Sequence, residues 1–135
     1  MDLNGACHCG SVKFRTRLLD GLKTARRCTC SYCRMRGAVA VSAELDGLEI
    51  LQGAERLSRY QFNTNTAEHY FCSRCGIYTH HRRRSNPNHY GVNVACLEGC
   101  NPFELNEVPV MDGVNHFSDT GEARVLGVMK FVRNE

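Results

Sequence analysis

The feature of this sequence with the clearest chemistry is the grouping of its cysteines. Nine cysteines occur in 135 residues, and seven of them form three tight groups. These groups are Cys7 with Cys9, Cys28 with Cys30 and Cys33, and Cys72 with Cys75. An odd number of closely spaced cysteines favours metal thiolates over disulfide bonds. Zinc is the expected ion, because it readily takes sulfur ligands in tetrahedral geometry.

Two of the groups together supply the ligands of a closed metal site. Cys7 and Cys9 are two residues apart, so an extended strand would direct both side chains to one face. Cys72 and Cys75 form a tight knuckle followed by Gly76, which tolerates a positive φ and lets backbone N–H groups approach sulfur. Four thiolates fill a tetrahedral zinc site, so we expect this site to be structural.

The stretch CTCSYC contains the remaining group and offers one ligand fewer. We expect Cys28 and Cys30 to share a strand face and Cys33 to return after a turn. Three protein ligands are typical of a catalytic zinc, whose fourth position takes water or substrate. The spacing leaves a second alternative open, in which Cys96 is an extra ligand that closes the site. Cys96 suits either this role or that of a buried, inert cysteine, and Cys100 is a weaker candidate.

Length and composition predict one domain over residues 1–135, because 42% hydrophobic residues are sufficient for a core. The formal charge of +3 does not indicate a nucleic-acid surface. Seven bound thiolates and two zinc ions would bring that charge to zero. No stretch reaches the about 18 to 20 apolar residues of a membrane span. Because Met1–Gly5 also carry no apolar run, we expect a cytoplasmic protein without membrane contact.

Short segments of alternating hydrophobicity predict a mainly β fold. The expected strands are residues 11–17, 38–45, 48–51, 59–62, 68–71, 89–97 and 124–132. Turn-forming residues separate them, among them Asp46-Gly47 between the second and third strands. One helical turn is expected near Asn101–Leu105, where Asn101 suits the cap and Pro102 the first helical position.

Three cysteine motifs, in this order and at these separations, resemble a known family: GACHCGSVKF, CTCSYCRMRGA and YFCSRCGIY. The sequence from Gly5 to Leu97 is similar to the glutathione-dependent formaldehyde-activating enzymes (GFA), a group that includes the centromere-protein-V (CENP-V) domain. The resemblance implies an Mss4-like fold of short antiparallel sheets tied by zinc. It implies a structural zinc at Cys7, Cys9, Cys72 and Cys75 and a catalytic zinc at Cys28, Cys30 and Cys33. The implied activity is that of a carbon–sulfur lyase acting on S-hydroxymethylglutathione, the adduct of formaldehyde and glutathione.

A zinc ion with three thiolate ligands suits chemistry on thiols. Such an ion exchanges its water for another soft ligand, for example the thiolate of glutathione, which it ionises and orients. The same ion stabilises sulfur as a leaving group when the carbon–sulfur bond of a hemithioacetal breaks. Arg34 and Arg36 closely follow Cys33 and are candidates to bind substrate, because guanidinium groups pair with carboxylates such as those of glutathione.

The sequence does not single out the group that moves the proton of the hemithioacetal hydroxyl. The candidates are His8, His69, His80, His81, His89, His116 and Tyr32. A lone histidine is more often a surface residue than an acid–base catalyst, so we assign this role to none of them.

A second hypothesis gives both zinc ions a purely structural role. In it the chain is a non-catalytic binding module whose HHRRR stretch, His80–Arg84, contacts protein or nucleic acid. Aromatic and basic residues do not alternate as a stacking platform requires, so nucleic acid is not expected. For Arg82–Arg84 a solvated charged face is the simpler interpretation. We therefore prefer an enzyme with a small-molecule thiol as partner, and self-association into a homo-oligomer is expected only as a general tendency of small β domains.

Overall fold

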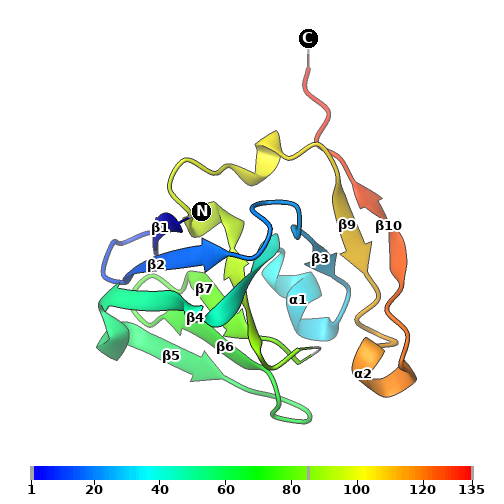
Figure 1. The fold of residues 1–135 in the computed structure, drawn as a ribbon, viewed down its shortest axis with the longest axis horizontal. Helices are drawn as coiled ribbons and strands as arrows, with labels where there is room; N and C mark the ends of the chain where they lie inside the picture. The colour runs from blue at the N-terminus through cyan, green and yellow to red at the C-terminus, as the bar shows by residue number, and fades with distance from the viewer. Residues whose placement is uncertain (1, 85, 135) are drawn as a thin grey trace.

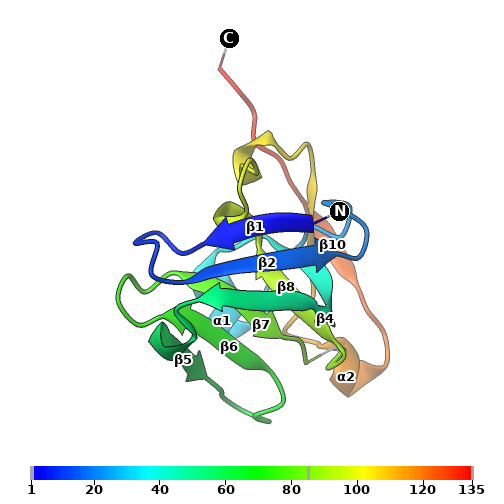
Figure 2. The same ribbon diagram turned by 60° about the vertical axis from the view of Figure 1, so that its left-hand side comes forward.

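The computed structural model describes residues 2–84 and 86–134, and within them the strands form two sheets. The larger sheet has seven strands in the order β1-β2-β4-β8-β7-β6-β5, with antiparallel neighbours throughout. Its strands are β1 (Asp2–Ala6), β2 (Lys13–Leu18), β4 (Ala40–Gln52), β5 (Leu57–Tyr60), β6 (Glu68–Cys72), β7 (Tyr78–Arg82) and β8 (His89–Asn93). Figure 2 shows β1, β2 and β4 running one above the other. The expected mainly β fold is confirmed, and the pairing is consistent with an Mss4-like arrangement.

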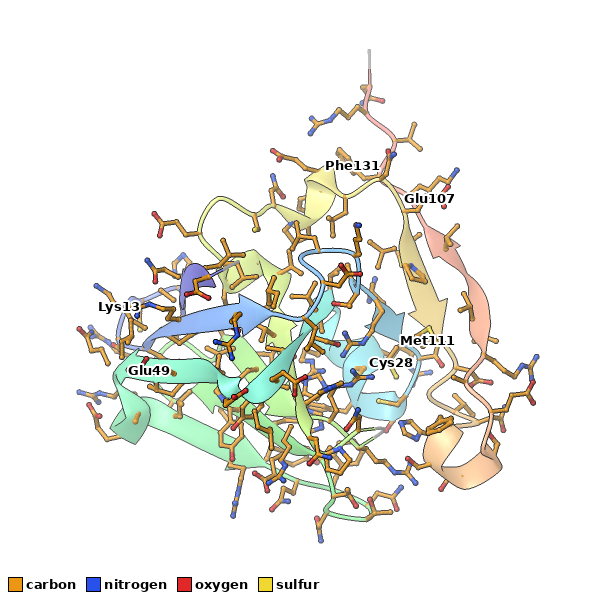
Figure 3. The ribbon with its side chains drawn as sticks, viewed as in Figure 1. Lys13, Cys28, Glu49, Glu107, Met111 and Phe131 are labelled. Carbon is orange, nitrogen blue, oxygen red and sulfur yellow. The ribbon has the colours of Figure 1, made fainter. Side chains whose placement is uncertain are left out.

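A smaller sheet has the order β10-β9-β3 and stands beside the larger one (Figure 1). Its strands are β3 (Arg27–Cys28), β9 (Val108–Met111) and β10 (Val125–Met129). β10 is antiparallel to β9, whereas β3 is parallel to β9 and places Cys28 opposite Met111. Figure 3 labels these two residues where the strands meet. This pairing brings the C-terminal part of the chain next to the stretch CTCSYC.

Short helical segments connect the strands of the described residues. They are α1 (Ser31–Arg36), α2 (Phe117–Thr120) and the 3-10 turns η1 (Ala54–Arg56), η2 (Val94–Cys96) and η3 (Pro102–Glu104). The expected helical turn near Asn101 is confirmed as η3, because the Asn101 side chain accepts a hydrogen bond from the N–H of Phe103 at 3.0 Å. None of the helices in the described ranges is long and apolar enough to cross a membrane.

The core forms where strands of alternating polarity face one another. In β2, Phe14, Thr16 and Leu18 are buried, and the basic residues between them are exposed. Phe14 and Leu18 pack with Val41 of β4 and Val92 of β8 in the main hydrophobic core. Burial of one face of β2 therefore fixes the register of this part of the sheet.

The prediction of two strands between residues 38 and 51 is wrong. β4 continues through Asp46-Gly47, and the pairing of β2 with β4 shifts there, as in a β-bulge. The carbonyl oxygen of Gly47 accepts a hydrogen bond from the Thr16 hydroxyl at 2.9 Å. A Cβ at Gly47 would lie 2.9 Å from the carbonyl oxygen of Arg17, so glycine fits the close approach of the backbones. The turn signal thus marks an irregularity inside one long strand.

Other strand predictions differ at their ends. The strand expected over residues 89–97 stops at Asn93, whose side chain accepts from the N–H of Ala95 and begins η2. The strand expected over residues 124–132 is β10, and every residue of it is exposed. β1, β3, β7 and β9 were not predicted. They are short or rich in polar residues, so their apolar alternation is weak.

We expect Phe14→Ala to lower the free energy of unfolding by about 3 to 5 kcal/mol, because it removes a fully buried aromatic ring and leaves a cavity. Met35→Ala is the control, since Met35 is 81% exposed and we expect a change below about 0.5 kcal/mol. Denaturant titration of both variants at equal metal loading makes the comparison. Equal stability of the two variants would contradict the described core.

Candidate metal centres and the adjoining cavity

Four cysteines come together in the first cluster, with sulfur atoms all within 4.8 Å of one another: Cys7, Cys9, Cys72 and Cys75. Cys7 and Cys9 lie in the turn after β1, not on an extended strand face, so that detail of the prediction is wrong. The N–H of Gly10 donates to the carbonyl of Cys7 at 3.1 Å, and this turn brings the sulfurs of Cys7 and Cys9 to 3.6 Å. The knuckle is as expected: Gly76 has φ +78°, and its N–H donates to the carbonyl of Cys72 at 2.8 Å.

The first cluster has the surroundings of a structural site. Cys7 and Cys72 are buried with Val12 in a small core separate from the main one. The N–H of Val12 donates to Cys7 Sγ at 3.3 Å, and the N–H of Arg74 donates to Cys72 Sγ at 3.4 Å. Backbone donors of this kind stabilise thiolates. The donor set fits a four-thiolate metal ion that would tie the β1–β2 hairpin to the β6–β7 hairpin.

The second cluster consists of Cys28, Cys30 and Cys33, whose sulfur atoms also lie within 4.8 Å of one another. Cys28 ends β3, Cys30 is the N-cap of α1, and Cys33 lies in the first turn of this helix. The expected shared strand face is therefore wrong for Cys30, whereas Cys33 does return to the other sulfurs, through the first turn of a helix. The N–H of Cys30 donates to Cys28 Sγ at 3.4 Å, and the N–H of Cys33 donates to Cys30 Sγ at 3.3 Å. These two N–H groups at the start of α1 point toward the sulfurs and hold the side chains of Cys28 and Cys30 near Cys33.

The proximity of the three thiols alters their acidity. Hydrogen bonds from Cys28 and then Cys33 lower the pKa of the Cys30 thiol. Hydrogen bonding to Cys28 and then Cys30 raises the pKa of the Cys33 thiol. The cluster therefore keeps protons that a metal ion must displace, and metal affinity falls as the pH is lowered.

Gly113 belongs to the second cluster although sequence reasoning missed it. A Cβ at this position would lie 2.3 Å from Cys28 Sγ and 2.6 Å from the backbone nitrogen of Cys30. The N–H of Gly113 donates to Thr29 Oγ1 at 2.9 Å, and the N–H of Thr29 donates to the carbonyl of Met111 at 3.1 Å. Only a residue without a side chain fits against the sulfurs here. The sequence signal was a single glycine some eighty residues away, which local patterns do not connect to the cysteines.

Cys96 lies outside both clusters in the described structure. Its Sγ donates a hydrogen bond to the carbonyl of Tyr78 at 3.4 Å, and burial raises the pKa of its thiol to about 12. Cys96 and Cys100 both pack against the main core. Within residues 2–84 and 86–134, the second cluster therefore has three cysteine ligands.

The two arginines that follow Cys33 have different surroundings. Arg34 is exposed and does not line the cavity described below. Arg36 turns inward: its Nη2 donates to Cys33 Sγ at 3.3 Å, and its Nη1 donates to His69 Nδ1 at 2.9 Å. Its guanidinium carbon also lies 3.8 Å from the ring centroid of Tyr78, in a cation–π contact. Arg36 is thus engaged with the protein on several sides.

The second cluster lies in the wall of a cavity of about 630 Å³, a volume typical of sites for small ligands. Six arginines line the cavity: Arg26, Arg27, Arg36, Arg83, Arg84 and Arg124. Asp112 is the one acidic lining residue in the described part of the chain. Arg84 forms an ion pair with Asp119 of α2. The remaining excess of positive charge favours an anionic ligand.

Two of these arginines converge on one hydroxyl group. Arg26 Nη1 donates to Ser42 Oγ at 3.1 Å, and Arg83 Nη1 donates to the same oxygen at 2.9 Å. Burial and the nearby charge of Arg83 lower the pKa of Arg26 to about 10. Two half-buried cations held this close are stabilised by an anion. Arg83 therefore does not belong to the fully solvated charged face that we expected for Arg82–Arg84.

The histidines divide between the cavity and the protein body. His69, His81 and His116 line the cavity. His80 is buried instead against aromatic rings of β6 and β8, and its Nδ1 lies 2.9 Å from Thr79 Oγ1. Burial, and then the charge of Arg36, lower the pKa of His69 to about 4. Three of the acid–base candidates thus reach the space beside the second cluster.

Comparison with known proteins identifies the family. A model of the glutathione-dependent formaldehyde-activating enzyme family matches residues 2–110. The chain belongs to this family. The cavity-lining residues between Met111 and Arg124 come after the end of the GFA match, so part of the cavity wall lies outside the region that the family model describes.

Individual relatives agree with this assignment. A protein of Halomonas elongata, provisionally named a glutathione-dependent formaldehyde-activating enzyme, is 39% identical over 84 residues. The match covers 56% of this chain and 52% of the relative, so the chain spans about half the length of this curated relative. A crystal structure of a Rhodobacter sphaeroides protein is 60% identical, with a TM-score of 0.78. That match covers 79% of this chain and 98% of the other.

The two clusters predict different effects of losing a ligand. We expect Cys7→Ser to unfold the protein, because the first cluster connects two hairpins and its metal contributes folding free energy. We expect Cys28→Ser to leave a folded protein with one bound metal fewer. Circular dichroism and metal analysis of both purified variants provide the measurement. Loss of folding in Cys28→Ser together with a folded Cys7→Ser would reverse these assignments.

Gly113→Ala tests the close packing around the second cluster. We expect metal affinity at this cluster to fall by about 10- to 100-fold, because the added methyl group must displace Cys28 Sγ or the backbone of Cys30. Gly127→Ala is the matched control, since a Cβ there meets nothing within 4 Å. Competition with a chelating dye measures both variants. Unchanged affinity in Gly113→Ala would show that the loop does not confine the sulfurs.

Proposed function

We propose that this protein is a zinc-dependent carbon–sulfur lyase that acts on a thiol–aldehyde adduct such as S-hydroxymethylglutathione. The observation that carries the proposal is the second cluster, which has three cysteine ligands in the described residues and adjoins a cavity lined by arginines. Three ligands leave one tetrahedral position for a ligand from the cavity. Membership of a family named for glutathione-dependent formaldehyde activation supports the same substrate class.

The residues of both clusters fit zinc. Their donor sets consist only of thiols, and Gly113 keeps the space around Cys28 and Cys30 free of a side chain. Cys28, Cys30 and Cys33 would hold the catalytic ion. When bound there, zinc supplies a position at which a substrate thiol is ionised and its sulfur is stabilised as a leaving group.

The proposed reaction is a reversible addition. In the direction of synthesis, the thiolate sulfur forms a bond to the aldehyde carbon, and the π electron pair moves to the oxygen, which takes up a proton. In the direction of cleavage, the hydroxyl loses its proton, the carbonyl forms, and the electron pair of the carbon–sulfur bond stays on sulfur. The chain must therefore bind the thiol, orient the aldehyde and stabilise the oxygen.

Arg26 and Arg83 are the side chains best situated to bind a carboxylate of the thiol. Both line the cavity, and their guanidinium groups share the Ser42 hydroxyl. Guanidinium groups bind carboxylates through paired hydrogen bonds. Arg34 lies outside the cavity and Arg36 already contacts Cys33 and His69, so substrate contact by these two remains a prediction with less geometric support.

The alternative of a non-catalytic binding module has less support. It requires the arginines of the HHRRR stretch to form an outward face, yet Arg83 and Arg84 line the cavity beside the second cluster. A positive cavity next to a three-cysteine cluster favours a small anionic thiol over a macromolecule.

Calorimetric titration of the zinc-loaded protein tests the proposal. We expect glutathione to bind and S-methylglutathione, which has no ionisable thiol, to bind at least about tenfold more weakly. We expect the Cys28→Ser variant to lose both the tight binding of glutathione and the acceleration of the exchange between formaldehyde and glutathione. Exchange of formaldehyde with glutathione, followed by NMR, measures turnover. Equal binding of glutathione and S-methylglutathione would exclude coordination through the thiolate and contradict the proposed function.

A pair of arginine variants tests where the carboxylate binds. We expect Arg26→Gln to weaken glutathione binding by about 10- to 100-fold, because hydrogen bonds to a charged group are lost. The same variant should bind 2-mercaptoethanol, which has no carboxylate, as the unsubstituted protein does. Arg34→Gln is the matched control and should bind both thiols normally, since Arg34 is exposed outside the cavity. Weaker glutathione binding in Arg34→Gln alone would assign the carboxylate to the outer arginine instead.

A further inference from the structure

The addition of a thiolate to an aldehyde places negative charge on an oxygen, and the proposed function so far assigns no donor to that oxygen. A donor in the cavity close to the second cluster would supply the missing stabilisation. His69 is the candidate that the hydrogen-bond geometry selects. This inference rests on the proposed function and goes further by assigning a residue to the oxygen.

The contact between Arg36 and His69 determines where the imidazole carries its proton. Arg36 Nη1 lies 2.9 Å from His69 Nδ1. A guanidinium group has only donors, so Nδ1 must be the acceptor. An imidazole whose Nδ1 accepts is neutral, and its proton is on Nε2. Burial and the charge of Arg36 lower the pKa of His69 to about 4, which agrees with a neutral ring.

The Nε2–H edge of His69 faces the remaining free space. His69 is 4% exposed and lines the cavity. Nε2 has no hydrogen-bond partner in the described ranges 2–84 and 86–134. Arg36 Nε is the one buried side-chain nitrogen or oxygen without a partner in those ranges, so His69 Nε2 is accessible to solvent. An N–H donor that is open to the cavity and has no protein partner is suited to an acceptor from a ligand.

Neighbouring rings hold the orientation of His69. Its ring stacks on Phe62 and His81 at interplanar angles of 21° each, with centroid distances of 5.7 and 5.2 Å. Tyr32 contacts it edge-on at 4.7 Å. Rotation of the ring by 180° about χ2 would break the bond to Arg36 and leave that guanidinium buried with fewer partners. The direction of the Nε2–H bond is thus set by packing.

Arg36 connects this histidine to the second cluster. The same guanidinium donates from Nη2 to Cys33 Sγ at 3.3 Å. One rigid planar group therefore relates the position of a metal-ligand sulfur to that of the imidazole. His81 has no such connection, since its Nδ1 lies 2.6 Å from the Tyr78 hydroxyl. His116 has none either, because its Nδ1 accepts from the N–H of Ser118 in α2 at 3.0 Å.

We propose that the Nε2–H of neutral His69 donates a hydrogen bond to the aldehyde oxygen of the adduct, and that Arg36 is the positioning residue that holds His69 in this tautomer. As the carbon–sulfur bond forms, the π electron pair moves to the oxygen, which receives a proton from a water molecule and leaves a hydroxide ion. In cleavage the hydroxyl returns that proton to hydroxide, which becomes water again. His69 keeps its own proton in both directions and stabilises the charge on the oxygen.

The tautomer is tested without any measurement of activity. Nitrogen-15 NMR of the histidine-labelled, zinc-loaded protein distinguishes a ring protonated at Nε2 from one protonated at Nδ1. We expect His69 to carry the proton at Nε2 from pH 6 to pH 8. Arg36→Leu should release Nδ1 and produce a mixture of tautomers. A ring protonated at Nδ1 in the unsubstituted protein would overturn the proposal.

Turnover of three variants tests the donor itself. Gln has an amide nitrogen near the position of Nε2, whereas Asn has one near Nδ1. In the NMR exchange assay we expect His69→Asn to lose about 100- to 1,000-fold in turnover and His69→Gln to lose less than about tenfold. The dissociation constant for glutathione should change less than about twofold in both. His89→Asn is the matched control and should retain normal turnover, because His89 does not line the cavity and its Nδ1 lies 3.1 Å from Asn86 Nδ2.

The outcomes separate this inference from the proposed function. Equal turnover in His69→Asn and His69→Gln, with glutathione still bound, would overturn the role of His69 and leave the function standing. An equal loss of turnover in His89→Asn would show that the effect is not specific to the cavity and would also overturn the role of His69. Failure of the unsubstituted protein to bind glutathione or accelerate the exchange would overturn the function, and with it the role of His69, whatever the tautomer.

Discussion

The close approach of sulfur atoms in two clusters is the constraint on which the rest of the structure depends. Groups of four and three cysteine sulfurs lie within 4.8 Å, a separation at which thiolates repel one another unless a cation lies between them. A divalent ion between the sulfurs would replace this repulsion with metal–sulfur bonds that link the chain segments carrying the cysteines. Metal binding would then contribute to the free energy of folding. An ion in the first cluster would in this way join two hairpins of the large sheet, which also share a small core around Val12.

The second cluster depends on contacts between distant parts of the chain. β3 contains two residues and pairs in parallel with β9, some eighty positions later. That pairing brings Gly113 against Cys28, where no side chain fits. The same C-terminal segment continues along the cavity as far as Arg124 and lies after the match to the family model. Residues that confine the cluster and residues that shape the cavity therefore belong to one stretch of the chain.

Arg36 is the residue that relates the cluster to the cavity. Its guanidinium group contacts a cysteine sulfur, an imidazole and the face of a tyrosine ring, and its Nε is buried without a hydrogen-bond partner in the described residues. A buried cation is costly unless anions lie near it. Burial lowers the pKa of Arg36, but Tyr78 and then Cys33 more than compensate and raise it. The sulfurs thus stabilise the arginine, and the arginine in turn orients His69.

Cysteine spacing predicted which cysteines within each short group lie together, because ligands two or three residues apart stay close in almost any local conformation. The tertiary structure decided that the Cys7 and Cys72 groups meet and that Cys96 lies outside both clusters. The mainly β class and the turn at Asn101 followed from alternation and capping for the same local reason. The helix of Cys30 and Cys33, the continuous β4 and the partners of Arg36 did not follow. The tertiary structure brings His69 of β6 to Arg36, and it brings Arg83, which follows β7, to the Ser42 hydroxyl that Arg26 also contacts. Such meetings depend on long-range strand pairing, about which the residues on either side in the sequence carry no information.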